Sequence, residues 1–276
     1  MKKTYQICLL AILGYIFISG CKSKQEEWIS LFNGKDLTGW TPKISGYALN
    51  ENFNNTFTVD SGILKVDYSK YQKFNGEFGH IFYKTPYSHY KIRLEYRFVG
   101  KQTEGGADWA NRNSGIMIHC QAPETMGKGQ SFPVSIEVQL LGGLGEGERT
   151  TGNVCTPGTL IDYEGKPYLE HCLSSKSKTY NGDNWVKSEV VVLGDSIIHH
   201  IIEGDTVLTY TKTRIGGGYM PKLSGNKETD LADSLEYVKN EGKPLSSGYI
   251  SLQAESGPVE FRKIELLDLG NEAEKP

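Results

Sequence analysis

Glu137 and His119 are the two side chains whose types and positions best suit proton transfer. Glu137 lies in the segment Ile136-Glu-Val-Gln139, and His119 closes the segment Ser114-Gly-Ile-Met-Ile-His119. A carboxylate can remove a proton from a substrate, and an imidazole can remove or donate one near neutral pH. We expect one to act as the base and the other as the acid, with the assignment open. The plain alternatives are a solvated carboxylate and a structural histidine.

Segments in which apolar and polar residues alternate must position these side chains. Such alternation is typical of β-strands, because successive side chains point to opposite faces of a sheet. Residues 90–98 have the cleanest pattern, and residues 135–140 place Glu137 and Gln139 on one face. Residues 248–266 alternate on both sides of Ser256-Gly257-Pro258, which predicts a hairpin. Its polar face carries Ser251, Gln253 and Glu255.

The fold class follows from the many short strands, which turns rich in Gly, Asn, Asp and Pro separate. This organisation predicts an all-β protein, either a sandwich or a barrel, within one domain. A short helix is expected near residues 228–238. Three long loops, 100–112, 121–133 and 141–184, interrupt the strands. Loops of that length are usually functional or disordered, so we expect them around a site.

The N-terminal residues predict export and lipid anchoring. Residues 1–20 combine a basic start with an apolar core, as in a signal peptide, and Ile18-Ser-Gly-Cys21 resembles a bacterial lipobox. Cys21 is therefore the expected lipidation site, 21–27 a tether, 28–270 the folded domain and 271–276 a tail. An ordinary signal peptide is the alternative. We expect a lipid-anchored protein of the bacterial cell envelope, with the membrane as a partner.

The charge and the cysteines limit the other partners. The formal net charge is −3, without the basic excess that nucleic-acid binding requires. A disulfide between Cys155 and Cys172 is our preferred pairing in an oxidising compartment. The alternative is metal binding, because the dipeptide His-Cys occurs at 119–120 and again at 171–172. No metal-binding motif is present, so the metal stays unassigned.

Four segments together resemble a known family. They are Trp28-Ile-Ser-Leu-Phe-Asn-Gly-Lys-Asp-Leu-Thr-Gly-Trp40, Asn113-Ser-Gly-Ile116, Ile136-Glu-Val-Gln139 and residues 248–266. Taken together, these segments make the chain similar to the 3-keto-disaccharide hydrolase domain family over residues 28 to about 268. The resemblance implies a concanavalin A-like sandwich (jelly roll) of two curved antiparallel sheets, with an oxidised 3-keto sugar as substrate. His119 departs from the arginine that many members carry there.

The resemblance also implies how the residues would act. Direct displacement at a glycoside needs two carboxyl groups, and Glu137-Val-Gln-Leu-Leu-Gly142 lacks the second and third carboxylates of the Glu-x-Asp-x-x-Glu pattern of family 16 glycoside hydrolases. We therefore expect proton abstraction at sugar carbon 2, elimination and hydration. The candidate substrate-binding residues are Gln139, Arg97, Glu95, Gln253, Asn113 and Lys187.

Arg97 and Glu95 also fit a cross-strand charge ladder. No cofactor is assigned, although a divalent metal ion could polarise the ketone. A carbohydrate-binding lipoprotein without turnover is the alternative function, since fold alone does not determine function.

Overall fold

The computed structural model describes residues 26–217 and 239–270. The expected signal peptide at 1–20, the lipidation site Cys21, most of the tether, the helix near 228–238 and the tail at 271–276 lie outside the described residues. Among the described residues, the model contains no helix with the length and apolar character needed to cross a membrane.

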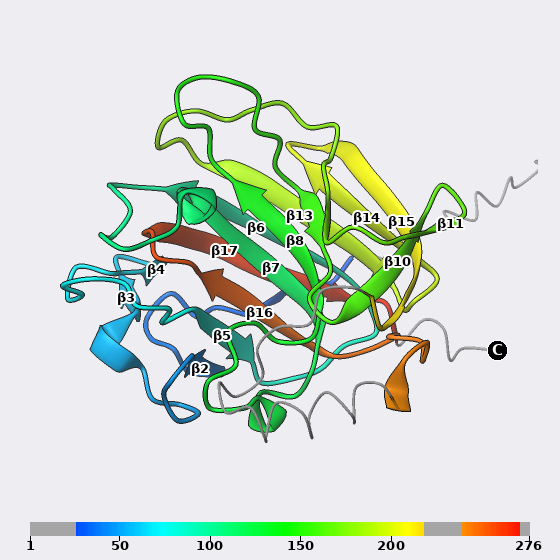
Figure 1. The fold of residues 1–276 in the computed structure, drawn as a ribbon, viewed down its shortest axis with the longest axis horizontal. Helices are drawn as coiled ribbons and strands as arrows, with labels where there is room; N and C mark the ends of the chain where they lie inside the picture. The colour runs from blue at the N-terminus through cyan, green and yellow to red at the C-terminus, as the bar shows by residue number, and fades with distance from the viewer. Residues whose placement is uncertain (1–25, 218–238, 271–276) are drawn as a thin grey trace, which may run out of the picture.

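The described residues form two antiparallel sheets that lie face to face, as Figure 1 shows. One sheet has ten strands in the order β11-β10-β15-β14-β13-β6-β17-β4-β3, with β1 paired to β17. These strands are β1 (Ile29–Ser30), β3 (Phe57–Asp60), β4 (Ile63–Val66), β6 (His89–Phe98), β10 (Thr159–Tyr163), β11 (Lys166–Tyr168), β13 (Val186–Leu193), β14 (Ile197–Ile202), β15 (Asp205–Ile215) and β17 (Val259–Asp268).

The other sheet has seven strands in the order β12-β9-β8-β7-β16-β5-β2. These are β2 (Trp40–Ile44), β5 (Gly79–Tyr83), β7 (Asn113–Cys120), β8 (Ile136–Leu141), β9 (Asn153–Cys155), β12 (Cys172–Leu173) and β16 (Tyr249–Ala254). Three single-turn 3-10 helices also lie in the described ranges: η1 (Phe53–Asn55), η2 (Asp108–Ala110) and η3 (Pro123–Thr125). The predicted all-β sandwich is confirmed.

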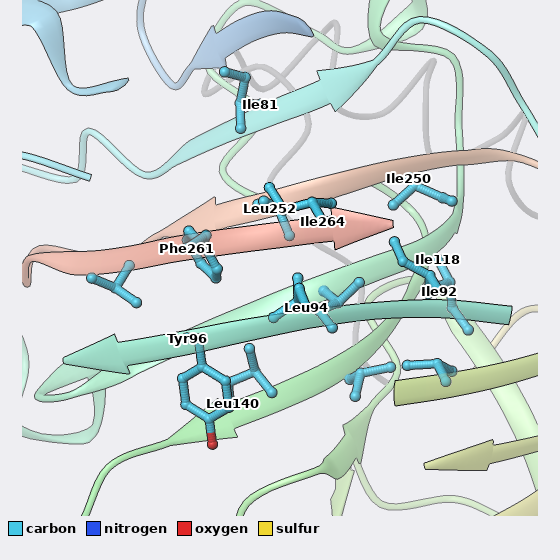
Figure 2. Close-up of a cluster of buried hydrophobic side chains, with 14 of the residues drawn as sticks. Ile81, Ile92, Leu94, Tyr96, Ile118, Leu140, Ile250, Leu252, Phe261 and Ile264 are labelled. Carbon is cyan, nitrogen blue, oxygen red and sulfur yellow. The ribbon is translucent and has the colours of Figure 1, made fainter. Parts of the chain in front are cut away.

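The apolar side chains of the two sheets meet in one core between the layers (Figure 2). From β6, the five side chains that the alternation placed on one face are all buried: Tyr90, Ile92, Leu94, Tyr96 and Phe98. They pack against side chains from β7, β8 and β16 of the facing sheet. Burial of one large apolar side chain contributes about 1.5–3 kcal/mol, so this layer supplies most of the fold's stability.

The predicted C-terminal hairpin is wrong, although both of its strands exist. β16 pairs with β5 and β7 in the seven-stranded sheet, whereas β17 pairs with β4 and β6 in the ten-stranded sheet. The turn at Ser256-Gly-Pro258 therefore carries the chain from one layer to the other. Alternation determines which side chains share a face, but it does not determine which strand is the neighbour.

The segment 141–184, predicted as one long loop, contains four short strands, β9 to β12. Cys155 on β9 lies opposite Cys172 on β12, and the two form a disulfide, as the sequence favoured. Cys120 is buried and has a free thiol. The disulfide fastens the outermost strand, β12, to the seven-stranded sheet.

Replacing both Cys155 and Cys172 by serine should lower the free energy of unfolding by about 2–4 kcal/mol, because a disulfide restricts the unfolded chain. Urea denaturation followed by tryptophan fluorescence measures the change. Cys120→Ser is the control for loss of a cysteine without loss of the disulfide. Equal stability of the double variant and the wild type would contradict the expectation.

Candidate functional site

A cavity of about 400 Å³ opens on the face of the seven-stranded sheet that points away from the core. This volume is within the range of small-molecule sites. Strands β7 and β8 contribute polar side chains to it, and the end of β16 contributes Glu255. All three predicted loops form its walls, with Trp109 from the first, Phe132 from the second and the Cys155 disulfide from the third. We call this the sheet cavity.

Glu137 lies at the floor of the sheet cavity, on β8, with only 6% of its surface exposed. Its side chain lies over Gly115 of the neighbouring strand β7. A Cβ atom at Gly115 would be 2.8 Å from Glu137 Cγ and 2.9 Å from Oε1, so only glycine leaves room for this carboxyl group. Burial raises the pKa of Glu137 to about 8. A carboxyl group with that pKa can accept or donate a proton near neutral pH.

Glu255 also lines the sheet cavity, from the residue after β16, and is 2% exposed. Burial, and then the charge of Glu137, raise the pKa of Glu255 well above its ordinary value. One of its carboxyl oxygens has no hydrogen-bond partner among the described residues. The expectation of a missing second carboxyl group is therefore wrong. The sequence placed Glu255 on the polar face, but its partner lies on a strand 118 positions earlier.

Two of the predicted substrate-binding residues border the carboxyl pair. Asn113, at the start of β7, donates its amide to the Trp109 carbonyl at 3.3 Å, and its Oδ1 is buried without a partner in the described ranges. Gln139 accepts a hydrogen bond from Asn153 Nδ2 at 3.0 Å. Both line the sheet cavity. The sequence prediction thus brought Glu137, Gln139 and Asn113 together correctly.

Trp109 and Phe132 form the aromatic wall of the cavity, and the sequence analysis singled out neither. Trp109 is 55% exposed and stacks on Phe78 with ring centroids 6.1 Å apart. Phe132 packs against the same Phe78 at 4.9 Å. The Trp109 carbonyl accepts hydrogen bonds from Asn113 and from Arg149, both at 3.3 Å, which fixes the backbone that carries the ring. An isolated tryptophan in a polar loop was the available signal.

Gln253 lies on the same face as Glu137, as predicted, but it is fully buried. Its β16 position pairs with His80 on β5. The register Leu252 opposite Ile116 also puts Gln253 opposite Gly115. Neither the Gln253 amide nor the His80 ring forms a hydrogen bond with any described residue. The structure thus adds His80 to the polar face.

His119 does not lie with Glu137, which corrects its assignment as a catalytic partner. The register between β7 and β16 shifts near His119, whose φ is +51°. Such a bulge interrupts the alternation of side chains along a strand. His119 Nε2 lies 3.1 Å from the Gly194 carbonyl, which belongs to the turn between β13 and β14 of the other sheet. Burial lowers the pKa of His119 to about 4.

Glu95, Arg97 and Lys187 lie on the ten-stranded sheet, so they do not belong to the sheet cavity. Arg97 Nη2 pairs with Glu260 at 2.6 Å, and Glu95 pairs with Arg262 at 2.6 Å. These pairs form the cross-strand charge ladder that the sequence left as the alternative. Glu95 and Lys187 border a separate cavity of about 370 Å³ on that sheet. Alternation could not say which sheet a strand joins.

Two groups of side chains bear on metal binding. Cys155, Cys172 and His171 have ligand atoms within 4.8 Å of one another, but the disulfide joins the two sulfur atoms. Disulfide sulfurs are not the thiolates that bind zinc. Glu137, Glu255 and Asn113 Oδ1 instead offer oxygen ligands, which suit Mg²⁺ or Ca²⁺. A cation at the carboxyl pair would compete with protons for the same oxygen atoms.

The fold and the sheet cavity define a concanavalin A-like sandwich with a polar site on one sheet. The family profile of the 3-keto-alpha-glucoside-1,2-lyase-like domain matches residues 27–267, and the chain belongs to this family of 3-keto-disaccharide hydrolase domains. The resemblance noted in the sequence is thereby confirmed. No curated protein matches the sequence.

Solved structures with a similar fold include two proteins from Parabacteroides distasonis ATCC 8503, both provisionally assigned as glycosyl hydrolases. The first is 17% identical, with a TM-score of 0.51, and the match covers 88% of this chain and 100% of that one. The second is 19% identical, with the same TM-score, and the match covers 88% and 94%. At these identities the likeness supports the fold alone.

Glu137→Gln should stabilise the protein at alkaline pH. The folded-state pKa of Glu137 is about 8, above the ordinary value of 4.5, so the neutral form is favoured on folding. That contribution is present below pH 4.5 and is lost as the pH rises through about 8. Glutamine stays neutral. We therefore expect the free energy of unfolding of the variant to exceed that of the wild type by on the order of 1 kcal/mol or more at pH 9, and to differ little at pH 4.

Urea denaturation at pH 4, 7 and 9 measures this difference. Glu124→Gln is the matched control, because Glu124 is exposed on η3. A stability difference between Glu137→Gln and the wild type that stays constant across the three pH values would contradict the raised pKa.

Proposed function

We propose that this protein cleaves the glycosidic bond of 3-keto-glycosides, with Glu137 and Glu255 as its proton-transfer pair. The observation that carries the proposal is the burial of two carboxyl groups together at the floor of one ligand-sized cavity. Two close carboxyl groups in a site of low polarity cannot both ionise readily, so once the first ionises, near pH 8, the second keeps its proton. One is then a base while the other is an acid. Membership of the 3-keto-glucoside lyase-like family supports the substrate class.

The reaction follows from the acidity that a ketone gives to its neighbouring carbon. The ionised carboxylate, Glu137 in our assignment, takes the proton from carbon 2, and the C–H electrons form an enolate with the oxygen on carbon 3. The enolate then restores the ketone, forms a double bond between carbons 1 and 2, and expels the glycosidic oxygen. Glu255 protonates that oxygen. Addition of water across the double bond completes a net hydrolysis.

Ordinary hydrolysis of an unoxidised glycoside is the second candidate, because it too requires two carboxyl groups. In a retaining enzyme one of the two must be an ionised nucleophile. Burial raises the pKa of both Glu137 and Glu255, which makes the ionised carboxylate a stronger base and so favours proton abstraction in our assignment. The comparison of oxidised and unoxidised substrates separates the two reactions.

Trp109 supports a sugar as the ligand. Its ring borders the sheet cavity, is 55% exposed, and is held by its packing against Phe78. Aromatic rings of this kind present a rigid apolar surface. The C–H face of a sugar is itself apolar, so we infer that Trp109 stacks on one ring of the substrate. The non-catalytic sugar-binding alternative shares this feature but gives no reason to bury two carboxyl groups.

The cell-envelope location also remains our proposal. The lipobox-like Ile18-Ser-Gly-Cys21 supports lipid anchoring at Cys21. The disulfide between Cys155 and Cys172 is consistent with an oxidising compartment. An anchored enzyme in that compartment would act on glycosides that have already been oxidised.

Release of the aglycone from a 4-nitrophenyl 3-keto-glucoside tests the function directly. We expect turnover of this substrate and none of the parent glucoside. Glu137→Gln should lower kcat/KM by about 10²–10⁴. Glu255→Gln should lower kcat/KM more for a 3-keto-disaccharide than for the nitrophenyl compound, because nitrophenolate leaves without a proton. With both substrates the rate should rise with pH through about 8, as Glu137 ionises. Only the rate on the 3-keto-disaccharide should fall again once the second carboxyl group ionises, because its leaving group needs a proton.

The controls of this assay decide between the alternatives. Glu124→Gln should match the wild type, since its carboxyl group is exposed on η3. Equal cleavage of the parent glucoside would favour ordinary hydrolysis. Binding of the keto sugar without turnover, with and without added Mg²⁺ or a chelator, would favour the binding protein.

Gly115→Ala should lower kcat/KM by at least about tenfold, with little loss of stability. The new methyl group would overlap the Glu137 side chain, which is flexible enough to move and would take the carboxyl group with it. Kinetics on the 3-keto-glucoside and a thermal melt measure the two effects. Gly257→Ala is the control, because a Cβ atom there contacts nothing within 4 Å. Unchanged kinetics of Gly115→Ala would show that this placement of Glu137 is not needed.

A further inference from the structure

A row of polar positions crosses the seven-stranded sheet beside the carboxyl pair. Lys43 on β2 pairs with His80 on β5, and His80 pairs with Gln253 on β16. Gln253 lies opposite Gly115 by continuation of the register, and Gly115 pairs with Gln139 on β8. Gly115 is thus a gap in the row, and the Glu137 side chain lies over it. The base and the polar row therefore meet at one point.

His80 and Gln253 are exceptional within this row because their polar atoms have no partners. Both residues are 0% exposed. Both ring nitrogens of His80 and both amide atoms of Gln253 form no hydrogen bond within the part of the chain that the structure describes. The great majority of buried polar groups in proteins are hydrogen-bonded. Two adjacent side chains left without partners, next to a ligand-sized cavity, indicate groups that bind something which enters the site.

The charges around these two side chains indicate what they would bind. Lys43 Nζ is held by the carbonyl groups of Ile44 and Lys128, at 3.1 and 3.0 Å. Burial, and then the charge of Lys43, lower the pKa of His80 to about 3, so its ring is neutral. A neutral imidazole and an amide are N–H donors. Burial lowers the pKa of Lys43 to about 8, so below that pH its positive charge favours negative charge nearby. A full anion, however, would be repelled by the neighbouring carboxyl pair. An oxygen that becomes negative only during the reaction fits both conditions.

We propose that His80 and Gln253 bind the ketone oxygen of the oxidised sugar and stabilise the negative charge that it gains when Glu137 removes the adjacent proton. This inference rests on the proposed function and adds the site of the enolate oxygen to it. Donors placed where charge develops are often the largest single contribution to catalysis.

The spacing across the sheet fits this role. Neighbouring strands lie about 4.8 Å apart, so the donor at Gln253 is one strand away from Gly115, over which the carboxylate lies. A sugar ring lying across β7 and β16 would present the hydrogen on carbon 2 to Glu137 and the adjacent ketone to Gln253 and His80. The base and the donors thus follow one another across the sheet in the same order as carbon 2 and the ketone at carbon 3 follow one another in the sugar ring.

Phe132 separates the sheet cavity from His80. Its ring lines the cavity and packs edge-on against the His80 ring, with centroids 5.9 Å apart. Because His80 and Gln253 are fully buried, Phe132 must move aside before a ketone can reach them. Phe132 belongs to the loop 121–133, one of the three long loops that the sequence predicts to lie around a site.

Variants of His80 test the proposal on the purified protein with the 3-keto-glucoside. His80→Leu should lower kcat by about 10²–10³ with little change in KM, as expected for a lost oxyanion donor. His80→Gln restores an N–H donor, so its kcat should be at least tenfold higher than that of His80→Leu. The rise of the rate through pH 8 should stay in place in both variants, because His80 is not the base. His199→Leu, on the ten-stranded sheet, should match the wild type.

A binding measurement separates this proposal from the proposed function. In protein with ¹⁵N-labelled histidine, 3-keto-glucose should shift the His80 ring signals, whereas glucose at the same concentration should not. This readout needs no turnover, so it also decides the inference if the wild type fails to cleave the 3-keto-glucoside. Unshifted His80 signals at saturating 3-keto-glucose, or a folded His80→Leu variant within threefold of the wild-type kcat, would overturn the proposal.

Discussion

The burial of two carboxyl groups beside each other is the constraint on which the site depends. Glu137 and Glu255 are 6% and 2% exposed, and neither forms an ion pair with a described residue, unlike the carboxylates on the opposite sheet. Removing a carboxylate from water is costly unless it is paired or takes up a proton. Burial raises the pKa of both groups, so each can be buried with its proton on. The raised pKa values also make the pair suited to proton transfer near neutral pH.

The two sheets treat their polar faces in opposite ways. On the ten-stranded sheet the charges are paired across strands, as in Arg97 with Glu260, and the guanidinium groups of Arg97 and Arg262 both lie close to the Trp185 ring. On the seven-stranded sheet the polar face carries Gln253, His80 and Glu255, with atoms that lack partners in the described chain. Unpartnered polar atoms beside a cavity are available to bind a ligand. This contrast is the reason why we place the proposed site on the seven-stranded sheet.

The core between the sheets supplies enough stability for the fold to carry unpartnered polar groups on one face. Long apolar rows from β6, β17, β8 and β16 meet in one layer, so the fold does not depend on the polar face for its stability (Figure 2). The disulfide between Cys155 and Cys172 fastens the edge of the functional sheet and forms part of the cavity wall. The loops that complete the cavity are thus held by a rigid scaffold, an arrangement common at binding sites.

The sequence by itself determined the long strands with clear alternation, their buried faces and the family, and it favoured the correct disulfide, because alternation and motifs are local properties of the chain. It missed the four short strands β9 to β12. Side-chain alternation also placed Glu137, Gln139, Gln253 and Glu255 on polar faces correctly. The tertiary structure alone decided which strands are neighbours. It separated β16 from β17, moved Glu95, Arg97 and Lys187 to the other sheet, and turned His119 away through a bulge. It also brought Glu255 to Glu137, since strand pairing over long sequence distances depends on packing between layers, which no local pattern encodes.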